Sequence, residues 1–447
     1  MFQVFRNAWM DTQLRKKILY TLFIIILFRL GSNIFVPFLD NNAISTMMEG
    51  ASLLNYLDVM TGGSLGKGTL LAMSITPYIN ASIIIQLLCV AIPPLEKLQK
   101  EGEEGRKKLN TITKFASLAI AVLQAIAFYF TLRNGVNDNS TGTHTAILKY
   151  GDVNDYSSDM FAVVLSAIVI VACFVAGASL IIWLGDRINE KGIGNGISMI
   201  LFAGIISGLP NAVEYFVTLC KDNLANIGFV LLAIVIFIAM VWFVIMMTNA
   251  ERRIPIQYAK RVVGRKMYGG QSTHIPIKVA MSGVMPIIFA MSLMSLPQTI
   301  CYFFGIDGRG DSFWDGFVRL FSQSSPLYAV IYFLLIIAFN YFYVSIQYNP
   351  VEIANNLKKN NGAIPGYRPG KPTSDFIYNS LNKITLIGAI FLGIVAIFPI
   401  ILALCVPSLS GISIGGTTIL IVVGVALETV RTLESQIMMR HHPGFLD

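Results

Sequence analysis

Ten long apolar runs, separated by polar segments, dominate the pattern along the chain. Each run is long enough to cross a bilayer as a helix and carries almost no charge. The runs lack the strict polar and apolar alternation that marks the strands of an outer-membrane barrel. The predicted spans are Ile18–Val36, Leu70–Ile92, Phe115–Leu132, Met160–Leu184, Ile193–Leu209, Ile227–Thr248, Val279–Phe304, Leu327–Gln347, Ile384–Val406 and Gly411–Leu427. The pattern therefore predicts an all-α integral membrane protein with ten transmembrane helices.

A short segment between the first two spans, residues 53–68, has a different pattern. Leu53, Leu54, Leu57 and Met60 recur at helical spacing, and glycines follow them. A helix of two to three turns is too short to cross a bilayer. We expect a small amphipathic helix outside the spans, and a helix that simply lies on the lipid interface remains an alternative.

Composition agrees with a membrane protein and argues against an enzyme. Of 447 residues, 55% are hydrophobic and 13% are charged, whereas soluble domains carry about 25% charged residues. The five cysteines and four histidines have neither disulfide-framework nor metal-site spacing. The stretch GGSLGKGT departs from a phosphate-binding loop, because Gly68 follows Lys67 where Ser or Thr is needed. We expect no catalytic residue, cofactor or metal.

Basic residues predict how the chain is oriented. Ten is an even number, so both termini lie on one side of the membrane. If that side is the cytoplasm, most of the 33 Lys and Arg residues fall in cytoplasmic segments, and the exterior segments are net negative. Positive loops stay in the cytoplasm. We therefore expect cytoplasmic termini and an exterior segment 53–68.

Two cytoplasmic loops, residues 249–278 and 348–383, are long and basic. In the first, Ile254, Ile256 and Tyr258 alternate with other residues, which predicts a β-ribbon. Such charge can simply face lipid headgroups. The length and patterning of these loops also suit docking of a protein or ribosomal RNA.

The ten spans divide into two sets of five, residues 1–210 and 211–447. The second span of each set carries a proline beside small and polar residues, Pro77 in one and Pro286 in the other. Sets with an odd number of spans enter the membrane from opposite sides, so a repeat would be inverted, with a pathway between the halves. Kinked helices with ordinary packing would give the same pattern.

The predicted spans have almost no charged side chains near the middle of the membrane, where ion-coupled transporters usually need them. Spans two to nine contain no Asp, Glu, Lys, Arg or His; Arg29 lies in the outer half of the first span and Glu428 at the inner end of the last. This favours a constriction closed by apolar side chains. A multi-span transporter for a neutral solute remains an alternative, as does an insertase or scaffold without a pore.

Six long motifs, in order along nearly the whole chain, resemble the SecY family, whose members form the channel subunit of the Sec protein translocon. The motifs are PYINASIIIQLL, KEGEEGRKKL, EKGIGNGISMILFAGI, RRIPIQYAKR with GGQSTHIPIK, NNLKKNNGAIPGYRPGKPT and GGTTILIVVGVALET. The resemblance implies a clamshell of two inverted five-helix halves around an hourglass pore. Unfolded secretory chains would cross this pore, and membrane-protein helices would leave it sideways into lipid.

The resemblance also assigns residues to parts of the channel. The apolar pore ring would be Ile79, Ile83, Leu201, Ile288 and Ile421. The exterior plug would be Leu53 to Thr61. In it, Leu54, Leu57 and Met60 would rest against the ring, and Asn55, Asp58 and Thr61 would face water. A loose hinge would follow, formed by Gly62, Gly63, Gly66 and Gly68. The lateral gate, between spans two and three and spans seven and eight, would include Asn80, Gln86, Gln124 and Ser292. Polar groups that serve only helix packing remain an alternative for these four residues.

Partners and location also follow from the resemblance. A motor ATPase, SecA, or a ribosome would dock on basic residues of the two long loops. These residues are Arg252, Arg253, Lys260, Arg261, Arg265, Lys266, Lys358, Lys359, Arg368 and Lys371. Further expected partners are the SecE and SecG subunits, signal peptides, unfolded secretory proteins and membrane lipid, and the expected location is the bacterial plasma membrane.

Overall fold

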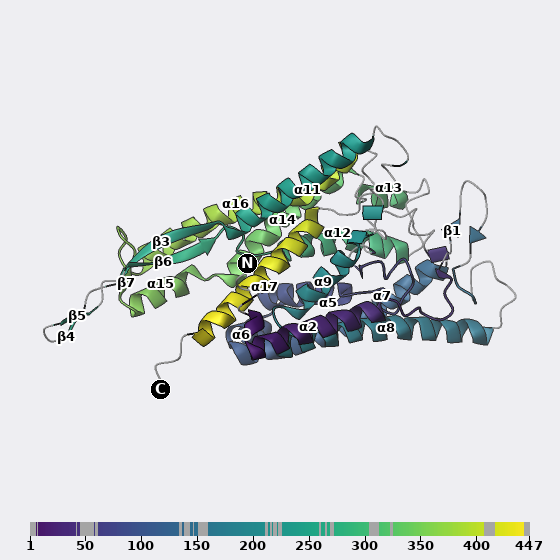
Figure 1. The fold of residues 1–447 in the computed structure, drawn as a ribbon, viewed down its shortest axis with the longest axis horizontal. Coiled ribbons are helices and arrows are strands. Elements are labelled where there is room, and N and C mark those ends of the chain that lie inside the picture. Colours follow the sequence, from purple (N-terminus) through teal and green to yellow (C-terminus); the bar gives the residue numbers. More distant parts are fainter. Residues whose placement is uncertain are drawn as a thin grey trace.

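In the computed structural model the fold is a long bundle of helices, with a three-stranded sheet at one end and the small hairpin of β1 (Val136–Asn137) and β2 (His144–Thr145) at the other (Figure 1). The structure describes residues 6, 8–41, 43–44, 58, 61–133, 136–137, 144–145, 147–150, 160–210, 213–214, 217, 221, 226–258, 261–263, 266–268, 272–303, 313–321, 325–405 and 416–441.

Each of the ten predicted spans coincides with a helix. In chain order these are α2 (Thr12–Gly31), α5 (Thr76–Ala91), α7 (Glu103–Arg133), α8 (Met160–Lys191), α9 (Gly196–Ser207), α11 (Asn226–Asn249), α12 (Met285–Phe303), α14 (Pro326–Gln347), α16 (Lys371–Cys405) and α17 (Gly416–His441). Among the described residues, five helices are long and apolar enough to cross a membrane unaided, or six if the bent pair α5 and α6 (Pro93–Lys100) is one span. The number ten therefore stays a prediction.

Local sequence explains where several helices begin. The Asp11 side chain accepts a hydrogen bond from the Gln13 amide and caps α2. The Asn195 side chain likewise accepts hydrogen bonds from the amides of Ile197 and Ser198 at the start of α9. Pro93 opens α6, which is bent by 108° from α5. The bend turns the chain away from the bundle before α7 begins.

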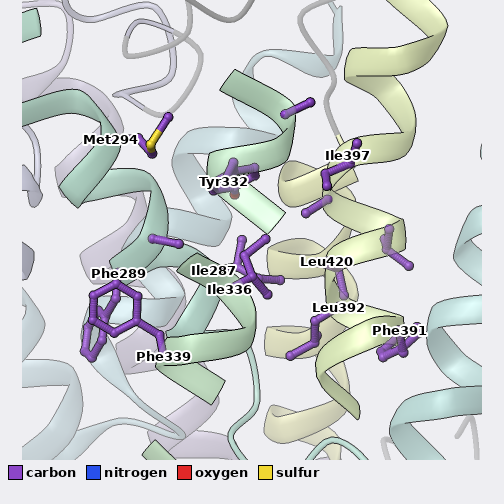
Figure 2. Packing of buried hydrophobic residues seen from close by; sticks show 14 of the residues in the cluster. Ile287, Phe289, Met294, Tyr332, Ile336, Phe339, Phe391, Leu392, Ile397 and Leu420 are labelled. Carbon is purple, nitrogen blue, oxygen red and sulfur yellow. The ribbon is translucent and has the colours of Figure 1, made fainter. Parts of the chain in front are cut away.

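Three large apolar cores hold the bundle. Helices α12, α14 and α16 supply most of one of them, including Phe289, Tyr332, Ile336 and Leu392 (Figure 2). The rings of Phe289 and Phe339 pack edge to face at 6.1 Å between centroids. The second core lies between α7 and α8, and the third lies among α2, α8, α9 and α17. The division of the chain at residue 210 stays a prediction.

The predicted β-ribbon is confirmed, and the two long basic loops form one body. Strand β3 (Glu251–Tyr258) pairs antiparallel with β6 (Ser272–Lys278), and β7 (Gly362–Ala363) from the second loop adds to the other edge of β3. We call β3, β6, β7 and α15 (Pro350–Lys359) the strand unit. A hairpin of β4 (Arg261–Val263) and β5 (Lys266–Tyr268) lies at its tip (Figure 1).

Alternation along β3 gives the strand unit its core. Ile254 and Ile256 are each 2% exposed, and they share an apolar cluster with Leu357 of α15 and Ile377 of α16. Because successive strand side chains point to opposite faces, the residues between these isoleucines remain exposed. The strand unit is therefore packed onto the long helix α16.

Candidate functional site

The predicted ring residues gather where the core around α12, α14 and α16 meets the core among α2, α8, α9 and α17. Leu201 of α9 and Ile421 of α17 are buried in one apolar cluster, and Ile79 of α5 and Ile288 of α12 pack against it. Ile83 belongs to the neighbouring cluster, which Ile79 also contacts. Side chains from four helices thus close one apolar layer. Their role in a pore stays a prediction.

A cavity of about 630 Å³ reaches this apolar layer from the end of the bundle that carries the strand unit. Leu201, Ile288 and Ile421 contribute to its wall, together with polar residues closer to the strand unit. Along α17 the wall continues from Ile421 to Glu428 and Arg431. Arg431 lies about 15 Å from Ile421 along the helix axis. The cavity therefore runs from a charged mouth to an apolar floor.

Arg431 links two helices, α17 and α11, at this charged mouth. Its guanidinium donates hydrogen bonds to the carbonyl oxygen of Thr248 at 3.1 Å and to Asn249 Oδ1 at 2.8 Å, at the carboxyl end of α11. Burial, together with the nearby charge of Arg431, lowers the pKa of Lys278, while Glu251 on the paired strand opposes this effect. The mouth is polar and positively biased, and Arg431 binds the last helix, α17, to the end of α11.

The four predicted gate residues lie on helices that meet at one seam. Asn80 and Gln86 belong to α5, Gln124 to α7 and Ser292 to α12, and α12 packs against both α5 and α7. Asn80 is buried, while Gln86 donates a hydrogen bond to Ser82 Oγ of its own helix at 3.2 Å. Gating by these side chains stays a prediction.

The glycine segment after the predicted plug, residues 62–68, is packed, whereas the sequence predicts a loose hinge here. Thr61, Ser64 and Thr69 are each at most 3% exposed. Thr61 Oγ1 donates to the carbonyl oxygen of Asp58 and accepts from the Leu65 amide, and Thr69 Oγ1 donates to the carbonyl oxygen of Ser64. The expectation that Thr61 faces water is wrong, because its hydroxyl is used inside this turn.

Asp58 also takes part in the turn. Its Oδ1 accepts a hydrogen bond from the Gly66 amide at 2.6 Å, and the residue is half-buried. Burial raises the pKa of this carboxyl, and the Gly66 and Leu65 amides and the charge of Lys67 counteract the effect. The predicted plug residues Leu53, Leu54, Leu57 and Met60, like Asn55, lie outside the described residues.

The predicted docking residues whose side chains are described lie on exposed parts of the strand unit and the turn after it. Arg253 pairs with Glu251 at 2.7 Å, and Thr373 Oγ1 donates to the carbonyl oxygen of Arg368 at 2.8 Å, which fixes the tip of that turn. The other exposed cations are Arg252, Lys358, Lys359 and Lys371. Lys260 and Arg265 lie outside the described residues, and Arg261 and Lys266 are described by their backbone in β4 and β5.

Sequence reasoning missed three features of the site. It did not foresee that β7 joins the two basic loops, that Arg431 binds the end of α11, or that the glycine segment is locked. A two-residue strand is too short to show a periodic pattern of polar and apolar residues. Contacts between segments far apart in the sequence also leave no such pattern.

Solved structures define the class of protein. The structure "The plug domain of the SecY protein stablizes the closed state of the translocation channel and maintains a membrane seal" matches with a TM-score of 0.66 and 18% identity, over 98% of this chain and 96% of that chain. "Sec61 in the Canine ribosome-channel complex from the endoplasmic reticulum" matches with a TM-score of 0.63 and 18% identity over the same shares. The fold is that of the translocation channels of membranes.

Sequence comparisons narrow the class to one family. The sequence profile of the SecY family matches residues 69–430. The "Protein translocase subunit SecY" of Streptomyces galbus is 39% identical over 454 residues, which cover 100% of both chains. That of Mycobacterium leprae is 39% identical over 460 residues, again across both full chains. The chain belongs to the SecY family. It is a multi-pass membrane protein that acts as the channel subunit of a protein translocase, and the comparisons give no support to a solute transporter.

Proposed function

We propose that this chain moves unfolded secretory proteins through a pore whose closed waist is the ring of Ile79, Ile83, Leu201, Ile288 and Ile421. The observation that carries the proposal is the apolar layer at the floor of the 630 Å³ cavity. Branched apolar side chains from four helices can close around an extended chain of any sequence without binding it strongly. With no chain threaded, the same layer excludes water and ions.

The cavity gives the pathway its direction. Its charged mouth lies beside the strand unit, on the side that the basic loops assign to the cytoplasm of a bacterial plasma membrane. Both termini lie on that side in this proposal. A client chain would enter the polar mouth, cross the apolar floor and leave on the exterior side, with energy supplied by a partner or by the membrane potential.

Lateral release would use the seam between α12 and the pair α5 and α7. The helices that meet at this seam carry uncharged polar residues, among them Asn80 and Ser292. Hydrogen bonds between membrane helices average about 0.6 kcal/mol. Contacts of this strength hold a closed seam and still yield to an inserted signal peptide or membrane helix.

The plug would seal the exterior side of the ring. In this proposal residues Leu53 to Thr61 rest beneath the ring when the channel is closed. The plug domain of the similar SecY structure is described as stabilising the closed state of that channel. Deleting Leu53–Thr61 should raise the resting ion leak of reconstituted vesicles while translocation remains possible. An unchanged leak would remove the plug from the proposal.

The strand unit would dock the partner that drives transport. Arg252, Lys358, Lys359 and Arg368 are exposed there, and the Arg368 turn presents a guanidinium able to bind a carboxylate or phosphate with two hydrogen bonds. One similar channel is described in a ribosome complex. We propose the ribosome and the SecA motor as alternating occupants of this surface, with SecE and SecG as subunits in the membrane.

Crosslinking tests the pore directly. In a variant without the five native cysteines, single cysteines replace Ile83 or Ile288, and a stalled secretory client carries a photo- or thiol-reactive probe. Adducts at both positions are expected during transport. The matched control is Ile394→Cys on α16, which is 50% exposed on the outer surface of the bundle and should give none. Transport without adducts at Ile83 and Ile288 would refute the pore.

Conductance separates the channel from the other function classes. Replacing both Ile288 and Ile421 by serine should let water into the waist and raise resting ion conductance. A scaffold without a pore would show no change. Solute counterflow in vesicles without any motor or client would instead support a transporter.

A further inference from the structure

The chain enters α5 and α12 through two turns of the same construction. These helices belong to the second predicted span of each half. We call residues 70–75 the α5 entry turn and residues 279–284 the α12 entry turn. Pro77 is the second residue of α5, and Pro286 is the second residue of α12. In each helix a predicted ring residue, Ile79 or Ile288, follows two residues after the proline.

The backbones of the two entry turns also match. Ser74 has a φ of +48° and Gly283 a φ of +62°, and each stands two residues before its helix. The Ser74 amide donates to the carbonyl oxygen of Leu71 at 2.9 Å. The Gly283 amide likewise donates to that of Ala280 at 3.4 Å. Because a residue with a Cβ is unfavourable in the left-handed region, the surroundings of Ser74 must impose this conformation.

A glycine from the fourth predicted span of each half lies against the start of each entry turn. A Cβ on Gly177 of α8 would overlap the carbonyl oxygen of Leu70. A Cβ on Gly388 of α16 would overlap the carbonyl oxygen of Val279. Leu70 and Val279 stand at matching positions before α5 and α12. Only a glycine lets a helix approach the turn backbone this closely.

Further hydrogen bonds fix each entry turn within its own half. The Leu70 amide donates to the carbonyl oxygen of Ile34, just after α2, at 2.8 Å. In the α12 entry turn, Ser282 Oγ donates to Asn340 Oδ1 of α14. Asn340 Nδ2 donates in turn to the carbonyl oxygen of Thr385 on α16 at 2.9 Å. These three side chains are each at most 4% exposed, so the network is buried.

Both entry turns end at the apolar layer. Ile75 is buried in the apolar cluster that contains Ile421, and Val284 packs against the same cluster. The Ile79 amide donates to the carbonyl oxygen of Ile75 at 3.0 Å, and the Ile288 amide donates to that of Val284 at 3.3 Å. Each ring isoleucine therefore lies one helical turn from the end of its entry turn. A shift of the turn moves the isoleucine with it.

We propose that Gly177 and Gly388 are matched positioning residues for the closed waist. Each glycine lets one helix hold the entry turn of its own half, and that turn sets the height at which Ile79 or Ile288 enters the apolar layer. The two isoleucines are then an equivalent pair, placed by the same device in each half. The proposal rests on the pore ring proposed above and adds what holds two of its members in place.

Substitution of Gly388 tests the α12 entry turn through the resting ion leak of reconstituted vesicles. Gly388→Ala should push the turn away from α16 and displace Ile288. The leak should rise about tenfold, since overpacking shifts an equilibrium by roughly this factor. The matched control is Gly393→Ala on the same helix, whose Cβ would overlap the ring of Phe333 instead. It should lower the thermal unfolding midpoint and leave the leak unchanged. Equal leaks in the two variants would overturn the role of Gly388.

The same test in the first half addresses the pairing. Gly177→Ala should displace Ile79 and raise the leak by a similar factor. Its control is Gly105→Ala on α7, whose Cβ would overlap the carbonyl oxygen of Leu98 on α6, away from the apolar layer. The control should lose thermal stability without a leak. A leak in Gly388→Ala with none in Gly177→Ala would overturn the equivalence of the two turns.

Position 283 gives a milder test that does not depend on crowded packing. A Cβ at Gly283 meets nothing within 4 Å, so a substitution there changes only the backbone preference. Gly283→Ser copies Ser74, the residue at the matching position, and should keep the wild-type leak. Gly283→Val, with a branched side chain that disfavours a positive φ, should raise it. Equal leaks in these two variants would overturn the proposal, even if the alanine variants fail to fold.

Client crosslinking separates this proposal from the pore itself. If a client is transported without adducts at Ile288→Cys, the pore ring fails and takes the positioning role with it. If the adducts form while Gly388→Ala and Gly283→Val leak no more than wild type, the pore ring stands and the positioning role alone fails.

Discussion

Single side chains set the stability of the packed turn around Asp58. Burial raises the pKa of this carboxyl, so the packed turn favours its protonated form. When the pH rises above 3.8, the ordinary value for this group, and then passes the raised pKa, the packed turn loses stability relative to the released one. The hydrogen bond from the Gly66 amide limits this loss because the carboxylate can accept it.

We expect the resting leak of the wild-type channel to increase with pH across that acidic window. Asp58→Asn keeps an oxygen that accepts from the Gly66 amide and removes the charge, so its leak should stay low and independent of pH. Asp58→Ala leaves the amide without this acceptor, which costs about 1–3 kcal/mol, and should leak at every pH. Ion flux from vesicles as a function of pH measures all three, and a pH-dependent leak in Asp58→Asn would contradict the assignment.

Helix α9 shows how a glycine motif positions an element that carries a ring residue. Gly196 lies in the stretch KGIGNGIS, and a Cβ there would overlap the carbonyl oxygen of Gly185 on α8. Leu201 follows a little over one turn later on the same helix. The close contact between α8 and α9 therefore fixes the height and rotation at which Leu201 enters the apolar layer.

Gly196→Ala should push α9 away from α8, at a cost of about 1–3 kcal/mol for overpacking. We expect a lower thermal unfolding midpoint together with a higher resting leak. Gly208→Ala, at the other end of the helix, is the matched control, because its Cβ would meet the Ile205 carbonyl oxygen at 3.4 Å, an ordinary contact. Equal behaviour of the two variants would argue against this role for Gly196.

Across the whole molecule, the strand unit joins segments that the sequence keeps about 100 residues apart. Ile256→Ala removes a fully buried side chain from its core, which should destabilise the unit by about 2–5 kcal/mol. We expect faster protease cleavage in both basic loops and weaker ribosome binding, with the membrane helices intact. Arg252→Ala, an exposed change, should preserve protease resistance. Cleavage confined to the first loop would contradict the shared core.

The sequence predicts most of the architecture and less of the site. Apolar runs such as Phe115–Leu132 predict helices because lipid requires internally satisfied backbone groups, and the alternation of Ile254 with Ile256 predicts the ribbon. The contacts of Arg29 with Gly62 and of Arg431 with α11 depend on tertiary packing, which no local pattern records. The same holds for Thr61, whose polar side chain indicates a solvent-exposed position until its turn is seen.

The packed turn also limits how far a plug can travel. Ile44 is fully buried on one side of the segment, and Asp58 is hydrogen bonded on the other, so residues 45–57 are tethered at both ends. A chain of that length reaches at most about 25 Å from its attachments. If this segment is the plug, its return to the ring is an intramolecular reaction at high effective concentration. We then expect the channel to reseal on its own soon after each client leaves, without a partner to close it.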